Sequence, residues 1–313
     1  MAATLSRKPF GNYSLIRIGN EETYASFIPE RSAYIHEISL GGRQILWNYP
    51  DAESLEGNSG HRNLALVPFP NRLLEGTYSW KGESQSFPVN KPDTRSALHG
   101  FGPHARFTLD RVDLAAHGAT ARMTYLHQPA EHPTEYPYRV LFAVEVMVDI
   151  RLGDVTWRLD ATNLDDIDVP IGLGWHPYYL LPGGHEQAAL RMPPNEHVVL
   201  KNAIPTGARE IGLSAKQDVA ISTDWDDCYV LTDEKHQTVT LRSSADALEL
   251  SQLHDTRYTQ LYVPPDQGSV AVEPMSCAVN AFQDEKSEVR VSPGDSVTIG
   301  TNHHLKSEFV SAR

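Results

Sequence analysis

The stretch from residue 138 to residue 152 constrains the fold more than any other part of this sequence. Its apolar residues recur at every second position, in the order Val140, Phe142, Val144, Val146, Val148 and Ile150. Successive side chains of a β-strand point to opposite faces, so this alternation predicts a strand with one buried face. Gly153-Asp154 follows directly and predicts a two-residue hairpin turn into a second strand at 155–159.

Short apolar and alternating runs continue this pattern elsewhere, for example at residues 13–18, 106–109 and 122–126. No window of about a dozen residues has apolar side chains at the i, i+3, i+4 and i+7 positions, so long helices are not expected. The 21 glycines and 21 prolines are spread evenly, which is typical of many strands joined by loops. We therefore expect an all-β fold, one large antiparallel β-sandwich, forming a single domain over residues 1–313.

Charge and cysteine content narrow the possible functions. The chain has 40 acidic and 27 basic residues, a formal net charge of −13, which repels the phosphate backbone of nucleic acids. No apolar stretch is long enough to cross a membrane, and the first residues lack the apolar core of a secretory signal. Two cysteines are too few for a disulfide framework. We expect a cytoplasmic monomer or homodimer without nucleic-acid or membrane partners.

Two segments place an ionisable side chain in apolar surroundings. Glu273 lies in Ser-Val-Ala-Val-Glu-Pro-Met, at the edge of an apolar strand, and His176 lies among glycines and aromatic residues at 172–179. Apolar surroundings raise the pKa of a carboxylate, and histidine titrates near neutrality. The two residues therefore form a candidate pair of general base and general acid.

Five separated segments, the two above among them, occur in the order found in a known family. They are Phe69-Pro70-Asn71-Arg72-Leu73, Leu98-His99-Gly100, Gly174-Trp175-His176-Pro177-Tyr178-Tyr179, Asp226-Asp227-Cys228-Tyr229, and Gln260-Leu261-Tyr262 followed by Val272-Glu273-Pro274-Met275. With these segments the chain resembles the aldose 1-epimerases, or galactose mutarotase-like proteins, over nearly its whole length. The resemblance implies a β-supersandwich. The Trp-His-Pro-Tyr and Glu-Pro-Met forms resemble the broader bacterial-type branch, whose sugars vary.

The resemblance also implies a reaction, the interconversion of the α and β anomers of an aldohexose by ring opening and reclosure. Glu273 would act as the base on the C1 hydroxyl, and His176 as the acid toward the ring oxygen. His99 would lie near the ring oxygen and share the work of the acid. Two proton-transfer groups suffice for this chemistry, so no cofactor and no metal are expected. The His127/His132 and His303-His304 pairs lack a third ligand at a familiar spacing.

Substrate binding falls, by the same resemblance, to Arg72, His99, Asp226 and Gln260. Arg72 would donate to sugar oxygens through its planar guanidinium. Asp226 would accept hydrogen bonds from neighbouring ring hydroxyls, since one carboxylate can bridge two donors. Asp227 is adjacent, and the sequence leaves open which of the two aspartates faces the site.

Two alternatives remain at this stage. The sugar could be anionic, a hexose 6-phosphate or a sulfonated hexose, because four cations lie near the Asn-Arg and Leu-His-Gly segments: Arg62, Arg72, Lys91 and Arg95. The chain could also be a carbohydrate-binding protein without activity, since a fold does not guarantee a function. Such a binder could dispense with the acid–base pair, which this chain retains.

Overall fold

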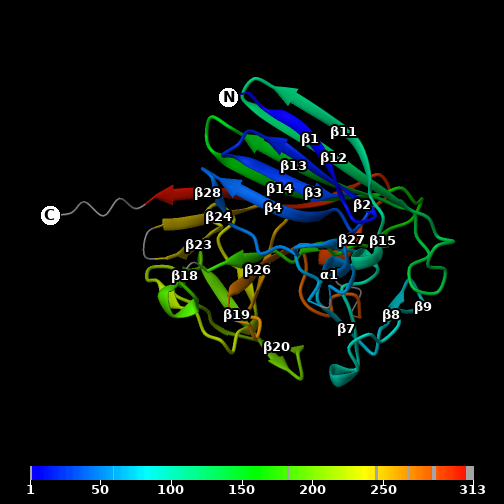
Figure 1. Cartoon of the computed structure of the whole chain (residues 1–313). Coiled ribbons are helices and arrows are strands. Elements are labelled where there is room, and N and C mark those ends of the chain that lie inside the picture. Colours follow the sequence, from blue (N-terminus) through cyan, green and yellow to red (C-terminus); the bar gives the residue numbers. More distant parts are fainter. Residues whose placement is uncertain are drawn as a thin grey trace.

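The structure is a computed structural model that describes residues 2–58, 60–181, 183–243, 246–266, 268–283 and 287–307. Strands dominate it (Figure 1), and the ladders of its large sheets are antiparallel. In this part of the chain the one α-helix is α1 (Ala52–Glu56), which starts where the Asp51 carboxylate accepts the Ser54 N–H. The predicted all-β class and antiparallel β-sandwich are confirmed. No described helix is both long and apolar enough to traverse a bilayer.

The nine-stranded sheet contains the strand expected from the alternating stretch. Val144 of this strand lies opposite Leu159 of the next, and Val146 lies opposite Trp157, so the apolar residues of both strands share one face. That face is buried. The residues between them are partly exposed in β14, whereas in β13 Ala143 and Glu145 of the other face are buried as well. In spatial order the strands are β11 (Thr108–Ala115), β12 (Gly118–His127), β13 (Val140–Asp149), β14 (Asp154–Asn163), β28 (Ser296–Ser307), β24 (Asp246–His254), β23 (Thr238–Arg242), β18 (Ala189–Arg191) and β21 (Val219–Ala220).

The turn between β13 and β14 differs from the two-residue hairpin predicted at Gly153-Asp154. Asp149 pairs with Asp154, so residues 150–153 form the loop. The Asp149 carboxylate accepts the backbone N–H groups of Arg151 and Leu152, and these bonds stabilise a longer turn. Gly153 closes the loop with a φ of 73°, a left-handed conformation that glycine adopts without steric cost.

Two further sheets cover the nine-stranded one. The five-stranded sheet comes from the N-terminal part of the chain, in the order β1 (Thr4–Phe10), β2 (Tyr13–Gly19), β3 (Tyr24–Ile28), β4 (Tyr34–Leu40) and β5 (Arg43–Gln44). The eight-stranded sheet has the order β20 (Ile204–Ile211), β19 (Asn195–Lys201), β22 (Asp226–Leu231), β25 (Tyr258–Tyr262), β26 (Ser269–Met275), β16 (Gly174–Trp175) and β6 (Ala65–Leu66), with β17 (Tyr178–Leu180) also paired to β26.

Three two-stranded ladders complete the described strands. They join β7 (Arg72–Leu74) to β10 (Ser96–Leu98), β8 (Thr77–Trp80) to β9 (Glu83–Ser86), and β15 (Val169–Pro170) to β27 (Arg290–Val291).

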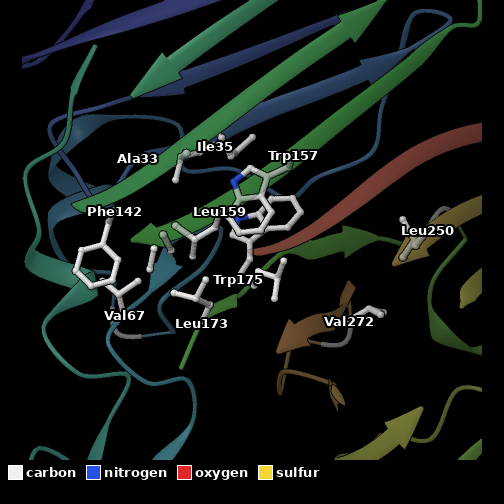
Figure 2. Close-up of a cluster of buried hydrophobic side chains, with 14 of the residues drawn as sticks. Ala33, Ile35, Val67, Phe142, Trp157, Leu159, Leu173, Trp175, Leu250 and Val272 are labelled. Carbon is white, nitrogen blue, oxygen red and sulfur yellow. The ribbon is translucent and has the colours of Figure 1, made fainter. Parts of the chain in front are cut away.

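The three large sheets meet in one hydrophobic cluster. Strands β2 to β4 pack on β12 to β14, and β26 packs on β28 (Figure 1). Figure 2 shows Trp157 of β14 beside Trp175 of β16; their rings are stacked, with centroids 4.6 Å apart and planes 14° apart. Ile35 of β4 and Val272 of β26 belong to the same cluster. Because Trp175 directly precedes His176, this core fixes the backbone from which the candidate acid projects.

Candidate active site

His176 and Glu273 come together through strand register. Gly174 pairs with Met275, and Tyr178 pairs with Ala271 on the same strand, β26. His176 lies midway between Gly174 and Tyr178, and Glu273 lies midway between Ala271 and Met275 on the facing strand. The His176 Nε2 is 3.4 Å from the Glu273 Oε1. The backbone of His176 is also fixed, since its N–H donates to the Leu64 carbonyl and its carbonyl accepts the Asn63 N–H.

Burial gives this pair its protonation state. His176 is 7 % exposed and Glu273 is 2 % exposed. Burial raises the pKa of Glu273 well above its usual value; the Asp226 charge raises this pKa further, and Arg72 lowers it. Burial lowers the pKa of His176 well below its usual value, and the neighbouring His61 and Arg62 also lower it. Both shifts favour an uncharged pair, a protonated carboxyl beside a neutral imidazole, with one proton between them.

His99 lies next to His176, with ring centroids 5.3 Å apart. The backbone N–H of His99 donates to the Asn71 carbonyl over 2.9 Å, and the backbone N–H of Asn71 donates to the Nδ1 of the His99 ring over 3.0 Å. An Nδ1 that accepts a backbone N–H carries no proton, so the proton of the neutral ring is on Nε2. Burial lowers the pKa of His99 well below its usual value, and His61, His176 and Arg72 lower it further. His99 is therefore a neutral hydrogen-bond donor.

Four side chains beside this group form a closed ring of hydrogen bonds. Asn71 Nδ2 donates to Gln260 Oε1 over 3.1 Å, and Gln260 Nε2 donates to Asp226 Oδ1 over 2.8 Å. Arg72 closes the ring by donating to Asp226 Oδ2 over 3.3 Å and to Asn71 Oδ1 over 3.1 Å. Gln260 lies directly opposite Glu273 in the β25–β26 ladder, so strand pairing places the ring against the carboxyl. The ring therefore offers a polar ligand both hydrogen-bond donors, from the guanidinium and amide groups, and acceptors, from the carboxylate and amide oxygens.

The structure distinguishes between the two adjacent aspartates. Asp226 lines the same cleft as Glu273, whereas the Asp227 carboxylate bonds the His197 Nε2 over 2.9 Å. Successive side chains of β22 point to opposite faces of the sheet, which explains the division. Asp226, the residue assigned by resemblance, is the one that faces the candidate site.

The cleft that contains these groups has a volume of about 470 Å³. Its lining includes all six residues singled out from the sequence: Arg72, His99, His176, Asp226, Gln260 and Glu273. Around them lie Tyr178, Tyr262, Lys91 and the tip of the β19–β20 hairpin at Asn202 and Ala203.

Two further side chains line the cleft, His61 and Asn71, and neither was predicted from the sequence. The His61 ring lines the cleft and packs edge-on against the His99 ring, with centroids 4.8 Å apart. No local pattern marks His61, because a long-range contact brings its loop to the site: the Asn63 N–H donates to the His176 carbonyl over 2.8 Å. Asn71 stood within the Pro-Asn-Arg motif, which was the available signal, but its role in closing the ring requires the fold.

The four cations considered for an anionic sugar have different positions. Arg72 and Lys91 line the cleft, and each pairs with a carboxylate, Asp226 and Asp93 respectively. Arg62 pairs with Asp266 beside Tyr178, and Arg95 pairs with Glu75. Within the described residues no group of three or more His, Cys, Asp or Glu side chains is arranged to hold a metal ion.

Comparison with known proteins identifies the family of the chain. The family model described as aldose 1-epimerase matches residues 14–304. The chain belongs to the aldose 1-epimerase family. Among curated relatives, the uncharacterised protein YihR of Escherichia coli strain K12 is 25 % identical over 230 residues, which cover 71 % of this chain and 72 % of the relative.

Solved structures show the same fold at lower sequence identity. A galactose mutarotase-like protein from Clostridium acetobutylicum superposes with a TM-score of 0.85 at 14 % identity, over 98 % of this chain and 99 % of the other. A galactose 1-epimerase from Lactobacillus acidophilus has a TM-score of 0.82 at 12 % identity, over 97 % of this chain and 98 % of the other. The β-sandwich of this family member is therefore of the galactose mutarotase-like type.

Proposed function

We propose that the protein is an aldose 1-epimerase that interconverts the α and β anomers of a neutral aldohexose by acid–base catalysis. The observation that carries the proposal is the buried His176–Glu273 pair, 3.4 Å apart and lining a polar cleft. Membership of the family supports the reaction class. Ring opening moves one proton from the C1 hydroxyl to the base and one from the acid to the ring oxygen, and ring closure reverses both transfers.

Glu273 is assigned as the base and His176 as the acid. The base must be ionised, yet burial, and after it the neighbouring Asp226 charge, raises the pKa of Glu273. A sugar that donates hydroxyl hydrogen bonds to Asp226 disperses that charge, so substrate binding itself moves Glu273 toward the carboxylate and the shared proton toward His176. Each of the two proton transfers contributes a factor of about 10²–10⁴ to the rate.

His99 and the ring of four side chains bind and orient the sugar. The His99 Nε2–H is available to donate to the ring oxygen, where charge develops as the C1–O5 bond breaks. Asp226 accepts from adjacent hydroxyls, and Arg72 and the amide of Gln260 donate to sugar oxygens. Both cleft cations already have carboxylate partners, Asp226 for Arg72 and Asp93 for Lys91, which favours a neutral sugar over an anionic one.

Anomer exchange measured directly tests the proposal. Freshly dissolved α-glucose and α-galactose are followed by polarimetry, and equilibrated sugars by NMR saturation transfer, with the corresponding 6-phosphates and a 6-sulfonated hexose as further substrates. We expect acceleration above the spontaneous rate, with a neutral hexose as the better substrate. Binding detected by calorimetry without faster exchange would instead identify a carbohydrate-binding protein. A 6-phosphate or 6-sulfonate with the higher kcat/KM would replace the neutral sugar as substrate.

A further inference from the structure

The His176 ring lacks the usual device that orients a catalytic imidazole. In most acid–base sites one ring nitrogen faces the substrate and the other is held by a carboxylate or a carbonyl. Here Nε2 faces Glu273, and Nδ1 is buried without a hydrogen-bond partner among the described residues. Packing against neighbouring side chains must therefore hold the ring at its working angle.

A column of planar groups meets the His176 ring. The Tyr178 ring is stacked on His176, with centroids 5.0 Å apart and planes 8° apart. The guanidinium carbon of Arg62 lies 4.6 Å from the Tyr178 ring centroid and 4.0 Å from the Trp47 ring centroid. Arg62 is held in turn by Asp266, with its Nη2 2.9 Å from the Asp266 Oδ2. Cation–π attraction and ring stacking both depend on this planar arrangement.

We propose that Arg62 is a positioning residue for His176 and acts through the Tyr178 ring. The inference rests on the proposed function, because it assigns His176 the role of acid. Arg62 itself does not line the cleft. It fixes the plane of Tyr178, and Tyr178 fixes the plane of the imidazole, in place of the missing hydrogen bond to Nδ1.

Tyr178 is anchored at its backbone N–H and at its hydroxyl, and neither bond involves the Arg62 side chain. The Tyr178 N–H donates to the Asn63 Oδ1 over 3.0 Å, and the Tyr178 hydroxyl donates to the Gly60 carbonyl over 3.1 Å. Trp175 also donates from its ring nitrogen to the Asn63 carbonyl. Replacement of the Arg62 side chain therefore leaves the segment in place and loosens only the stacking, so such variants should fold.

The charge of Arg62 gives a second observable. The titratable or charged groups facing His176 are Glu273, His99, His61, Tyr178 and Arg62. Of these, Arg62 is the permanent cation, and its charge opposes a further proton on the acid–base pair. A reaction that needs an ionised base and a protonated acid should have a bell-shaped pH profile. Removing the Arg62 charge should move both limbs of this profile toward higher pH, whereas a lysine at the same position should leave them unchanged.

Two substitutions separate orientation from charge. Arg62→Lys keeps the charge but loses the planar face, and Arg62→Met removes both. Arg111→Met is the matched control, because Arg111 pairs with Asp113 on β11 and does not line the cleft. We expect about a tenfold lower kcat in both Arg62 variants. In Arg62→Met alone, both pH limbs should rise by on the order of half a unit.

An Arg62→Lys enzyme with wild-type kcat would overturn the positioning role, whatever the methionine variant does. A lower activity accounted for entirely by a smaller folded fraction, with unchanged constants for the folded enzyme, would overturn it too. Asp266→Asn provides a variant in which Arg62 itself remains but loses its partner. It should reduce kcat in the same direction by about twofold to threefold, since a partly exposed ion pair contributes little.

A readout that needs no catalysis keeps this inference separate from the proposed function. Long-range ¹H–¹⁵N spectra report the tautomer and titration of each histidine ring, and the His176 signals are assigned by their loss in His176→Asn. In Arg62→Met we expect the His176 ring signals to shift and broaden, and in Arg111→Met to stay in place. Unchanged His176 signals in Arg62→Met would refute the positioning role. A wild-type protein inactive on every sugar would refute the proposed function, not this contact.

Discussion

Asn71 and His99 hold each other through two hydrogen bonds that run in opposite directions. The backbone N–H of Asn71 donates to the Nδ1 of the His99 ring, and the backbone N–H of His99 donates to the Asn71 carbonyl. Both residues adopt a left-handed backbone, with φ of 57° for Asn71 and 64° for His99. Such a conformation is uncommon outside glycine and marks positions that the surrounding structure holds in place. This pairing places the proton of the neutral His99 ring on Nε2, and the ring can therefore act as a hydrogen-bond donor.

The first prediction is that His99 acts as a neutral donor at every pH at which the enzyme works. His99→Gln keeps an N–H donor but changes its position, so kcat should fall about tenfold, the worth of one hydrogen bond. Both limbs of the pH profile should stay where they are, because burial keeps the pKa of His99 well below its usual value. Steady-state kinetics from acid to alkaline pH provide the check. Loss of either limb in the variant would show that His99 titrates in catalysis.

The second prediction concerns the coupling of Glu273 and His176. Glu273→Gln and His176→Asn should each reduce kcat by about 10²–10⁴-fold while sugar affinity survives, since shape and polarity are kept. One proton path requires both groups, so the double variant should lose far less than the product of the single losses. Exchange kinetics and calorimetry on the four proteins complete the cycle. Near wild-type exchange in Glu273→Gln would remove this residue from the mechanism.

The third prediction links Glu273 to stability. Its pKa in the folded state is raised above the ordinary value of 4.5, so the folded protein binds more protons than the unfolded chain between these two values. The contribution of this group to stability is then complete below about pH 4.5 and is lost as the pH rises through the folded-state pKa.

Glu273→Gln should therefore have a higher free energy of unfolding than the wild type in alkaline solution, by at least about 1 kcal/mol, because a buried charge is no longer formed. The difference should shrink toward pH 4.5. Urea denaturation at several pH values measures it. A constant difference between the two proteins over this range would mean that the Glu273 pKa is not raised.

The fourth prediction separates the adjacent aspartates. Asp226→Asn breaks the ring formed with Arg72 and Gln260 and removes an acceptor of sugar hydroxyls, so KM should rise at least about tenfold. Asp227→Asn is the matched control: it affects only the bond to His197, and kinetics should change by less than about twofold. Initial rates at varied sugar concentration test both. Equal effects of the two substitutions would contradict the assignment of Asp226 to the cleft.

Local sequence determined the fold class, and the resemblance of its motifs to a known family gave most of the candidate site residues. The period-two alternation at Val140–Val148 predicted a strand with one buried face. The structure contains that strand as β13, in which Ala143 and Glu145 of the other face are buried too. The two-residue turn predicted at Gly153-Asp154 was wrong: Asp149 pairs with Asp154, and the Asp149 carboxylate stabilises a loop of residues 150–153. The five motif segments already contained the six residues assigned to the site, and all six line the cleft.

Tertiary structure decided how those residues act together. His176 meets Glu273 because Gly174 and Tyr178 pair with Met275 and Ala271, and no spacing along the chain encodes that register. The direction of the Asp226 side chain, the closed ring through Asn71 and the place of His61 depend on contacts between segments far apart in the sequence. The spacing of apolar residues along the sequence indicates which face of a helix or strand is buried. The partner that covers that face is selected by packing of the whole core, so these relationships appear only once the chain has folded.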